Sequence, residues 1–408
     1  MKNLNLLVFF LLFSSADSFA ISNWTQKANF GGTARHRTTS FAIGNKGYMG
    51  LGHYNSGPGG NIHLADFWEY DTGSNAWTQK ADFGGGQRYH AVGEAFGNKA
   101  YVGTGRALGG VLMTDWWEFD PIANTWTLKA AFPGVGRRGA VTFIIDDYIF
   151  VGTGQVPTGY TDDFFAYDVV NDQWLGGIAP FPGSARTSAA SFTIENKGYV
   201  GTGGVGCGTT DFYEYKLTTN QWIQRADVGN LIRQEAAGFS VNGLGYIAAG
   251  DNCSSGENYQ DVWEYDPTLD TWTQIDDFGG SARRYLDAFV IGNRAFCGLG
   301  TSGVNYSDLW EFDAFLSTIQ RDLESIQVDI YPNPVIHNAN FVLSSIPQGG
   351  TASMFELKIM SLDGKLVYNE RFKSQKLNFD RNGLPSGIYV YHITYESQTI
   401  RNGKIILE

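Results

Sequence analysis

The sequence predicts an all-β protein whose main part is a β-propeller of six four-stranded blades, followed by a small Ig-like β-sandwich. A tryptophan recurs six times at spacings of 53, 49, 48, 48 and 50 residues, and a period of this size is typical of propeller blades. Two further marks recur with it, an arginine and an aspartate-rich aromatic segment. The 52 glycines, and the aromatic content of 15% against 17% charged residues, indicate short strands joined by tight turns.

The repeated tryptophans are expected to pack between adjacent blades, because their large side chains bury most area there. They are Trp24, Trp77, Trp126, Trp174, Trp222 and Trp272. Segments resembling Asp-x-Trp-Glu-Tyr-Asp occupy residues 66–71, 115–120, 163–168, 211–216, 261–266 and 308–313. Each copy therefore predicts four antiparallel strands, the third at the aspartate segment and the fourth around the next tryptophan.

An arginine stands fifteen residues before a Gly-x-Gly triplet, or its equivalent, in every copy. This fixed spacing predicts a first strand after the arginine and a second strand that ends at the triplet. Since a feature needed in every blade is more suited to a buried ion-pair device than to a catalytic site, we expect these arginines to be structural. They are Arg35, Arg88, Arg137, Arg186, Arg233 and Arg283.

The order of the copies predicts how the ring closes. Trp24 has no arginine or aspartate segment before it, and the sixth aspartate segment, 308–313, has no tryptophan after it. The N-terminal strand is therefore expected to become the outermost strand of the last blade. Such closure joins the two ends of the ring by backbone hydrogen bonds and leaves few sheet edges unpaired.

These repeated residues resemble the kelch repeat, and the resemblance extends from residue 22 to about residue 315. Gly-Thr-Gly replaces the adjacent glycine pair of many kelch units, and only residues 201–204 restore that pair. The resemblance implies a six-bladed kelch-type propeller over residues 21–315.

Residues 1–20 are predicted to be a signal peptide. Lys2 precedes an apolar run from Leu4 to Phe13, and Ser18-Phe19-Ala20 fits a cleavage site. No other stretch approaches eighteen apolar residues, so we expect no transmembrane segment.

The C-terminal part, after a linker at 316–327, alternates polar and apolar residues between Pro-Asn-Pro, Asp-Gly and Pro-Ser-Gly turns, which predicts the sandwich over 328–408. Its Tyr331–Pro334 motif and its terminal Lys404–Leu407 run resemble the type A sorting domain of the type IX secretion system of Bacteroidetes. The resemblance implies a protein that is secreted or held at the outer-membrane surface, with the type IX machinery as the partner of residues 328–408. An Ig-like module without a sorting role is the alternative.

Composition and motifs narrow the range of functions that the sequence allows. A net charge of −12 and a pI near 5.0 disfavour nucleic-acid binding. The sequence lacks nucleophile-elbow, His-Glu-x-x-His, Cys-x-x-Cys and phosphate-loop motifs. Four histidines (His36, His53, His63 and His90) fall in the first two units without a cysteine, so no metal and no cofactor is expected. Cys207 and Cys253 occupy equivalent loops of neighbouring units and are predicted to form a disulfide, whereas Cys297 is expected to be a buried thiol.

The candidate binding site lies where the copies differ. The residue two positions after the repeated arginine differs in every unit and is predicted to line the mouth of the central channel. These residues are Arg37, His90, Gly139, Ser188, Glu235 and Tyr285. The loops after Gly-x-Gly are expected on the same face, and they contribute His53, Tyr54, Arg106, Tyr160, Asp251, Asn305 and Tyr306. Such residues suit hydrogen bonding and stacking against a sugar or polar peptide, although plain solvated loops would look similar.

We therefore expect a secreted or surface-displayed binding module, with a carbohydrate ligand slightly favoured over a protein ligand. A sugar mutarotase or epimerase is the alternative, because such activity is known on six-bladed kelch propellers and needs little more than a carboxylate, an arginine and a histidine. Glu235, Arg37 and His90 are the catalytic candidates in that case. A structural surface protein without a discrete pocket is the third interpretation.

Overall fold

The computed structural model describes residues 23–55, 60–314, 326–344, 354–395 and 398–408. Contacts between residues divide the chain into two units, one spanning Ser22–Ala314 and another that includes Phe315–Glu408. The predicted signal peptide and most of the predicted linker lie outside the described residues. In the part of the chain that is described, no helix is long and apolar enough to cross a membrane.

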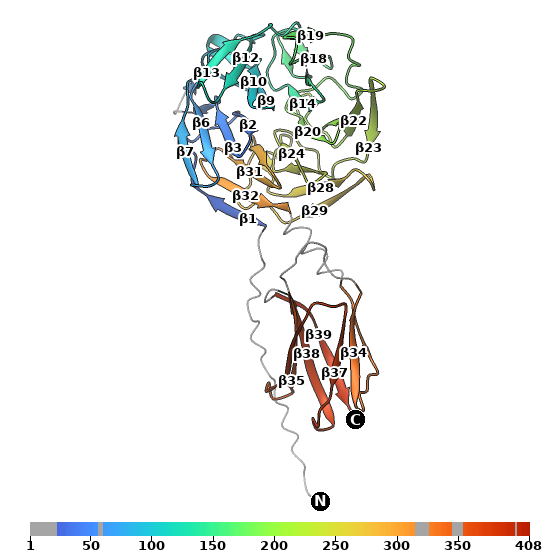
Figure 1. The fold of residues 1–408 in the computed structure, drawn as a ribbon. Coiled ribbons are helices and arrows are strands. Elements are labelled where there is room, and N and C mark those ends of the chain that lie inside the picture. Colours follow the sequence, from blue (N-terminus) through green and yellow to red (C-terminus); the bar gives the residue numbers. More distant parts are fainter. Residues whose placement is uncertain (1–22, 56–59, 315–325, 345–353, 396–397) are drawn as a thin grey trace, which may run out of the picture. The chain divides into compact units, whose positions relative to one another are not determined.

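The first unit confirms the predicted all-β architecture. It contains six four-stranded antiparallel sheets, which Figure 1 shows side by side around a common centre. The first three sheets contain β2 (Thr39–Ile43), β3 (Lys46–Gly50), β6 (Phe67–Asp71) and β7 (Ala76–Gln79); β9 (Val92–Phe96), β10 (Lys99–Gly103), β12 (Trp116–Asp120) and β13 (Thr125–Leu128); and β14 (Val141–Ile145), β15 (Tyr148–Gly152), β18 (Phe164–Asp168) and β19 (Gln173–Leu175).

The next sheets follow the same order. They contain β20 (Ala190–Ile194), β21 (Lys197–Gly201), β22 (Phe212–Lys216) and β23 (Gln221–Arg225); β24 (Ala237–Val241), β25 (Leu244–Ala248), β28 (Val262–Asp266) and β29 (Thr271–Ile275); and β30 (Asp287–Ile291), β31 (Arg294–Gly298), β32 (Leu309–Asp313) and β1 (Trp24–Lys27). The sixth sheet thus joins strands from both ends of the unit, since β1 pairs with β32 in the register Trp24 to Phe312.

Backbone hydrogen bonds connect each sheet to the next. Each Gly-x-Gly triplet, or its Ala248–Gly250 counterpart, ends in a glycine. This glycine donates its N–H to the carbonyl of the repeated arginine that precedes the next sheet. The pairs are Gly52–Arg88, Gly105–Arg137, Gly154–Arg186, Gly203–Arg233, Gly250–Arg283 and Gly300–Arg35, at 2.7–3.0 Å. These glycines have positive φ, which a residue with a side chain rarely adopts.

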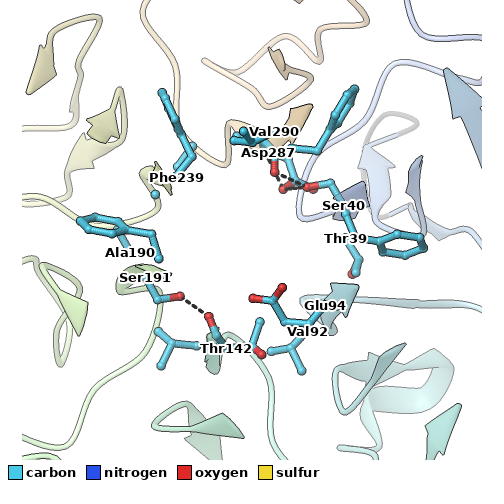
Figure 2. A pocket seen from close by; sticks show the side chains of 18 of the residues that line it. Thr39, Ser40, Val92, Glu94, Thr142, Ala190, Ser191, Phe239, Asp287 and Val290 are labelled. Atoms are coloured by element: carbon cyan, nitrogen blue, oxygen red, sulfur yellow. Dashed lines mark hydrogen bonds between the residues drawn. The ribbon is translucent and has the colours of Figure 1, made fainter. Parts of the chain in front are cut away.

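The innermost strands contact one another around a channel. β2 lies against β9, β9 against β14, β14 against β20, β20 against β24, β24 against β30, and β30 against β2. Figure 2 shows side chains from these strands directed toward the open centre, among them Ser40, Glu94, Thr142, Ser191 and Asp287. The channel is therefore lined by small and polar side chains from six different sheets.

The repeated arginines hold the third strand of each sheet to the loop before the first strand. Each arginine is at most 1% exposed and binds the first aspartate of its repeat segment through two nitrogens; in the first sheet, Arg35 Nη2 lies 2.8 Å from Asp66 Oδ2. Each arginine also donates to a backbone carbonyl sixteen residues later. Although the buried Nε of Arg88 and that of Arg233 have no partner among the described residues, the charge and the Nη groups of every repeated arginine are satisfied inside the scaffold, so these side chains have little left with which to bind a ligand.

The repeated tryptophans connect neighbouring sheets. Five of them donate their indole N–H to a carbonyl in the segment after the fourth strand of the preceding sheet, at 2.8–3.2 Å. Trp77, for example, donates to Ala28, which follows β1. These contacts combine burial of a large ring with one directed hydrogen bond.

Short hairpins rise from the loops that follow the second strands. They are β4 (His53–Asn55) with β5 (Asn61–His63), β16 (Gln155–Val156) with β17 (Gly159–Tyr160), and β26 (Asp251–Asn252) with β27 (Glu257–Asn258). In the second sheet's loop, β11 (Arg106–Ala107) instead pairs with β8 (Arg88–Tyr89), which precedes the first strand β9. One turn of 3-10 helix, η1, covers Leu108–Gly110. Isolated bridges join several of these loops to the residue after a repeated arginine, such as His36 to His53, so both sets of loops share one face.

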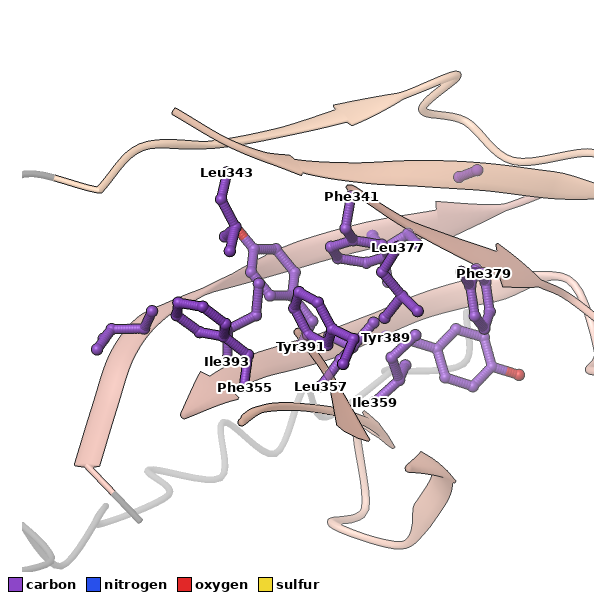
Figure 3. Packing of buried hydrophobic residues seen from close by; sticks show 14 of the residues in the cluster. Phe341, Leu343, Phe355, Leu357, Ile359, Leu377, Phe379, Tyr389, Tyr391 and Ile393 are labelled. Carbon is purple, nitrogen blue, oxygen red and sulfur yellow. The ribbon is translucent and has the colours of Figure 1, made fainter. Parts of the chain in front are cut away.

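The second unit is a pair of packed antiparallel sheets. One contains β33 (Val328–Tyr331), β34 (Asn338–Leu343) and β37 (Lys376–Asp380), and the other contains β35 (Phe355–Ser361), β36 (Leu366–Phe372), β38 (Gly387–Tyr395) and β39 (Gln398–Leu407). Figure 3 shows the buried side chains between them, and the rings of Phe341 and Tyr391 meet across the core at 5.4 Å.

The two ends of the second unit's motif pattern meet in space. Asn333, from the Tyr-Pro-Asn-Pro motif, accepts a hydrogen bond at 3.0 Å from the backbone of Ile406 in β39. Val335 exchanges backbone hydrogen bonds with Ile406 and Glu408 at 2.7 and 2.9 Å. The motif therefore has a structural role, because it fixes the chain's last strand against the start of the sandwich.

Candidate functional site

The six variable residues that follow the repeated arginines meet at one cavity. Arg37, His90, Gly139, Ser188, Glu235 and Tyr285 all line a hollow of about 180 Å³, and this hollow adjoins a channel space of about 410 Å³ between the innermost strands. The two spaces share lining residues such as Thr38 and Asp287. The hollow is thus the mouth of the channel, and below we call it the channel mouth.

Backbone geometry fixes this set of residues. All six have φ between 54° and 59°. Successive members are linked by N–H to carbonyl hydrogen bonds, from His90 to Arg37 (3.0 Å) and onward through the set to Tyr285 and Glu235 (2.7 Å). Consequently the side chains start from a rigid, evenly arranged frame, while their chemistry differs from one sheet to the next.

Arg37 is the central cation of the channel mouth. Its Nη1 donates to His53 Nε2 at 2.8 Å, its Nη2 donates to the Tyr285 hydroxyl, and its guanidinium carbon lies 4.2 Å from the centre of the Tyr285 ring. Since arginine can only donate, His53 accepts at Nε2 and carries its proton on Nδ1. Neither this nitrogen nor Arg37 Nε, both buried, has a hydrogen-bond partner among the described residues.

Glu235 is the carboxylate of the channel mouth. Burial raises its pKa to about 7, while a hydrogen bond from Tyr285 and the charges of Arg37 and Arg284 act in the opposite direction. Arg284 Nε lies 3.7 Å from Glu235, and its Nη1 lies 3.4 Å from Asp251, whose pKa is also raised by burial. Glu235 can therefore gain or lose a proton near neutral pH, as a general acid or base must.

Several histidines surround Arg37. The rings of His36 and His53 lie 4.2 Å apart, and His36 Nδ1 lies 2.8 Å from Asn305 Oδ1. Burial and the charge of Arg37 lower the pKa of His36 to about 4; burial, His36 and Arg37 lower that of His53 to about 3. The pKa values of His63 and His90 are lowered for similar reasons. These rings are neutral at physiological pH and act as hydrogen-bonding and stacking groups.

A second charged cluster adjoins Arg37 and centres on Tyr89. Arg106 Nη1 and Arg138 Nη1 both donate to the Tyr89 hydroxyl, at 3.2 and 3.1 Å. The guanidinium carbons of Arg37 and Arg138 lie 5.6 and 5.7 Å from the centre of the same ring. His53 and His63 also pack against Tyr89, with ring centres 4.6 and 4.9 Å away.

The channel below the mouth is acidic. The Asp287 carboxylate accepts hydrogen bonds from Thr38 and Ser40 at 2.7 and 2.6 Å. Glu94 projects into the channel in Figure 2, and burial raises its pKa to about 7. Carboxyl groups thus line both spaces, with Glu235 at the mouth, Glu94 in the channel and Asp287 in both, whereas Arg37 lines the mouth alone.

The remaining predicted ligand-binding residues occupy different places. Tyr54 and Tyr160 are half-buried in β4 and β17 and do not line the channel mouth. Tyr306 lies against the repeated Arg283, 3.8 Å from its guanidinium carbon, and contacts Ser302. Cys207 and Cys253 form a disulfide between loops of neighbouring sheets, and Cys297 is a buried free thiol.

Sequence reasoning missed Tyr89, Arg138 and Arg284. Each immediately follows a repeated arginine, a position occupied by His36, Tyr89, Arg138, Thr187, Gln234 and Arg284 in the six units. That position varies almost as much as the one after it, so the same criterion would have found it. Within the described residues, no group of three or more His, Cys, Asp or Glu side chains is arranged to hold a metal ion.

The fold defines an all-β protein with a propeller-like first unit. Residues 329–408 match the family model described as "Secretion system C-terminal sorting domain", which confirms the resemblance inferred for the C-terminus. This domain indicates secretion with attachment at the cell surface, and it implies interaction with the type IX secretion machinery.

The first unit is similar in fold to a solved structure entitled "Structure of YjhT". The identity is 18% and the TM-score is 0.57, and the match covers 69% of this chain and 96% of that one. At this level of identity the likeness extends to the propeller-like fold alone. No curated protein matches this chain.

Proposed function

We propose that residues 21–315 form a closed, six-bladed kelch-type propeller and that the exported protein binds a ligand at the channel mouth, with carbohydrate favoured over protein. The six four-stranded sheets and the cyclic contacts of their innermost strands support the ring. The pairing of β1 with β32 and the hydrogen bond from Gly300 to Arg35 support closure between the last blade and the first.

One observation carries the binding proposal: the side chains that differ between blades converge on one cavity, whereas the repeated ones are consumed by contacts inside the scaffold. The repeated arginines bind buried partners, and most of the repeated tryptophans donate to neighbouring sheets. Residues of the channel mouth are half-buried and present guanidinium, imidazole, hydroxyl and carboxyl groups. Concave sites with a few converging polar groups are the usual form of small-ligand sites.

The chemistry of the channel mouth favours a sugar. Tyr285 offers a ring on which a sugar face can stack, while Arg37, Ser188 and Glu235 offer donors and acceptors for hydroxyl groups. The channel continues the polar lining with Ser40, whose hydroxyl already bonds Asp287. A protein ligand would need a protruding side chain or loop to reach the same groups.

A glycan array probed with the full chain tests this function. We expect retention of a subset of glycans, and loss of that retention in the Arg37→Ala variant. Arg294→Ala is the matched control, because Arg294 belongs to β31 and pairs with Glu311 away from the channel mouth. Binding to no glycan, or equal binding by both variants, would refute a carbohydrate site at the channel mouth.

A sugar mutarotase or epimerase is the second candidate, and the ionisation of Glu235 favours it. A carboxyl group with a pKa of about 7 beside the Tyr285 hydroxyl and Arg37 can exchange a proton with a sugar hydroxyl. NMR exchange spectroscopy of a reducing sugar retained on the array would detect faster anomer exchange. Rates that stay at the uncatalysed value, or that are unchanged in Glu235→Gln, would leave binding as the function.

A further inference from the structure

The arginines of the first unit fall into two groups. Of the twelve arginines between Ser22 and Ala314, nine form ion pairs with a carboxylate: the six repeated ones, and Arg225, Arg284 and Arg294. The other three are Arg37, Arg106 and Arg138, and none of them forms an ion pair with any described residue. The three unpaired arginines are therefore an exception to the rule that this unit follows elsewhere.

All three unpaired arginines gather around Tyr89, although they come from three different sheets. Arg37 precedes β2, Arg106 begins β11, and Arg138 precedes β14. Arg106 and Arg138 donate to the same hydroxyl, and Arg37 and Arg138 lie within 6 Å of the ring centre. Three like charges brought this close repel one another, and the aromatic ring offsets only part of that cost.

The nearby carboxylates of Glu235 and Asp251, which also interact with Arg37, neutralise only part of this charge. His36 and His53 add no negative charge; burial is the largest cause of their lowered pKa values, and the charge of Arg37 contributes to both. Glu235 and Asp251 pair with Arg284. The cluster is thus cationic in a protein whose overall charge is −12, and its local field attracts an anion.

Unused hydrogen-bond donors point to the same conclusion. His53 is 1% exposed, and its protonated Nδ1 has no partner among the described residues, as is also true of Arg37 Nε. Buried donors without partners are rare in folded proteins, and a ligand is one of the explanations for them. Guanidinium groups match the paired oxygens of a carboxylate or sulfate particularly well.

We propose that the ligand of the channel mouth is an anionic carbohydrate, and that Arg37, Arg106 and Arg138 bind its carboxylate or sulfate group beside Tyr89. This inference rests on the proposed function and refines it. The anionic group lies over the first three blades, and the sugar ring extends past Tyr285, which contacts Arg37, toward Ser188.

The first experiment compares matched glycans on one array probed with the full chain: neutral glycans, the same glycans carrying a uronic acid, and the same glycans carrying a sulfate ester. We expect signal from the uronic-acid arm, the sulfate arm or both, and the stronger arm identifies the source of the anion. Equal or stronger signal from the neutral glycans would overturn this inference and leave the proposed function standing. Absence of signal from every arm would instead refute the proposed carbohydrate function.

The second experiment measures affinity by isothermal titration calorimetry, with the glycan that binds best. Arg138→Gln should weaken binding at least about tenfold, because one charge-assisted hydrogen bond is lost. Arg138→Lys keeps the charge and should lose less, and the slope of affinity against salt should fall in Arg138→Gln alone. Arg294→Gln is the control and should leave affinity unchanged. Wild-type affinity in Arg138→Gln, with its unfolding midpoint also unchanged, would overturn the assignment of the arginines.

Discussion

Trp24 offers the sharpest test of the proposed ring closure, because it is the repeated tryptophan contributed by the opposite end of the unit. The side chain is 4% exposed and packs against Phe278 and Phe312, with ring centres 5.1 and 4.9 Å away. Trp24→Ala removes a buried aromatic ring from the seam between β1 and β32. Such truncations cost about 3–5 kcal/mol of unfolding free energy. For a unit of this size, that loss lowers the unfolding temperature by roughly 6–15 °C.

Tryptophan fluorescence is a selective assay for this change. All eleven tryptophans lie in the first unit, so their emission follows its unfolding without a contribution from the second unit. Gln26→Ala is the matched control, because Gln26 is an exposed residue of the same strand and surface substitutions usually change stability by no more than about 0.5 kcal/mol. We expect a clear shift for Trp24→Ala and none for Gln26→Ala.

The opposite result would refute closure by the N-terminal strand. If Trp24→Ala unfolds at the parental midpoint, the side chain does not hold the sixth sheet together. The four residues of β1 pair with residues 309–312 of β32. A shortened chain that lacks β1 provides the second measurement, and closure by this strand would be refuted if that chain also unfolds at the parental temperature. Both measurements must show destabilisation for the closed ring to stand.

Three further predictions follow from buried groups. Asp261→Asn should destabilise the first unit by about 3–5 kcal/mol, because its arginine partner keeps a buried charge; a change below about 1 kcal/mol in the fluorescence assay would contradict the structural role of the repeated ion pairs. Reduction of the Cys207–Cys253 disulfide, which spans 46 residues, should cost up to about 4 kcal/mol, and a non-reducing mass map that finds both thiols free would remove this prediction. His53 has a folded pKa of about 3 against 6.5 in the unfolded chain. Between these values the unfolded chain binds more protons, so stability falls as the pH is lowered through 6.5. His53→Gln should remove about 2 kcal/mol of the stability lost between about pH 7 and pH 5, and identical pH profiles of stability for the two proteins would refute this prediction.

The repeated part of the fold could be predicted because each sequence repeat imposes the same constraints on its four-stranded sheet. An arginine at a fixed distance from Gly-x-Gly and an aspartate at the start of the third strand can satisfy each other only inside a sheet of this geometry, as Arg35 and Asp66 do. Six copies turn a weak local pattern into a strong one. The position of the channel mouth followed from the same logic, because departures from the repeat indicate positions that the scaffold does not need.

The composition of the candidate site was harder to predict, because it depends on contacts between blades. Tyr89 belongs to the second sheet's entry loop, yet its hydroxyl is held by Arg138 from the third and its ring faces Arg37 from the first. Residue spacing within one repeat cannot predict these contacts between side chains of different repeats. The directions of loop side chains were equally inaccessible, since Arg106, Tyr54 and Tyr160 do not line the channel mouth itself, and only Arg106 joins the cluster around Tyr89 that adjoins it.

Repeated residues stabilise the fold and variable residues face the candidate site, so binding tests can separate effects on stability from effects on affinity. Arg35 and its equivalents stabilise the sheets from positions where a ligand has no access, since each is at most 1% exposed. Residues of the channel mouth hold their frame through backbone groups, as in the hydrogen bond from Tyr285 to Glu235, and a substitution leaves that bond in place. Arg138 lies next to the channel mouth and is likewise held by backbone hydrogen bonds, which it exchanges with Gln155. Changes to its side chain should therefore alter affinity far more than stability, whereas changes to Asp261 should do the reverse. A variant of Arg138 that loses both together would show that the unpaired arginines serve the fold and not a ligand.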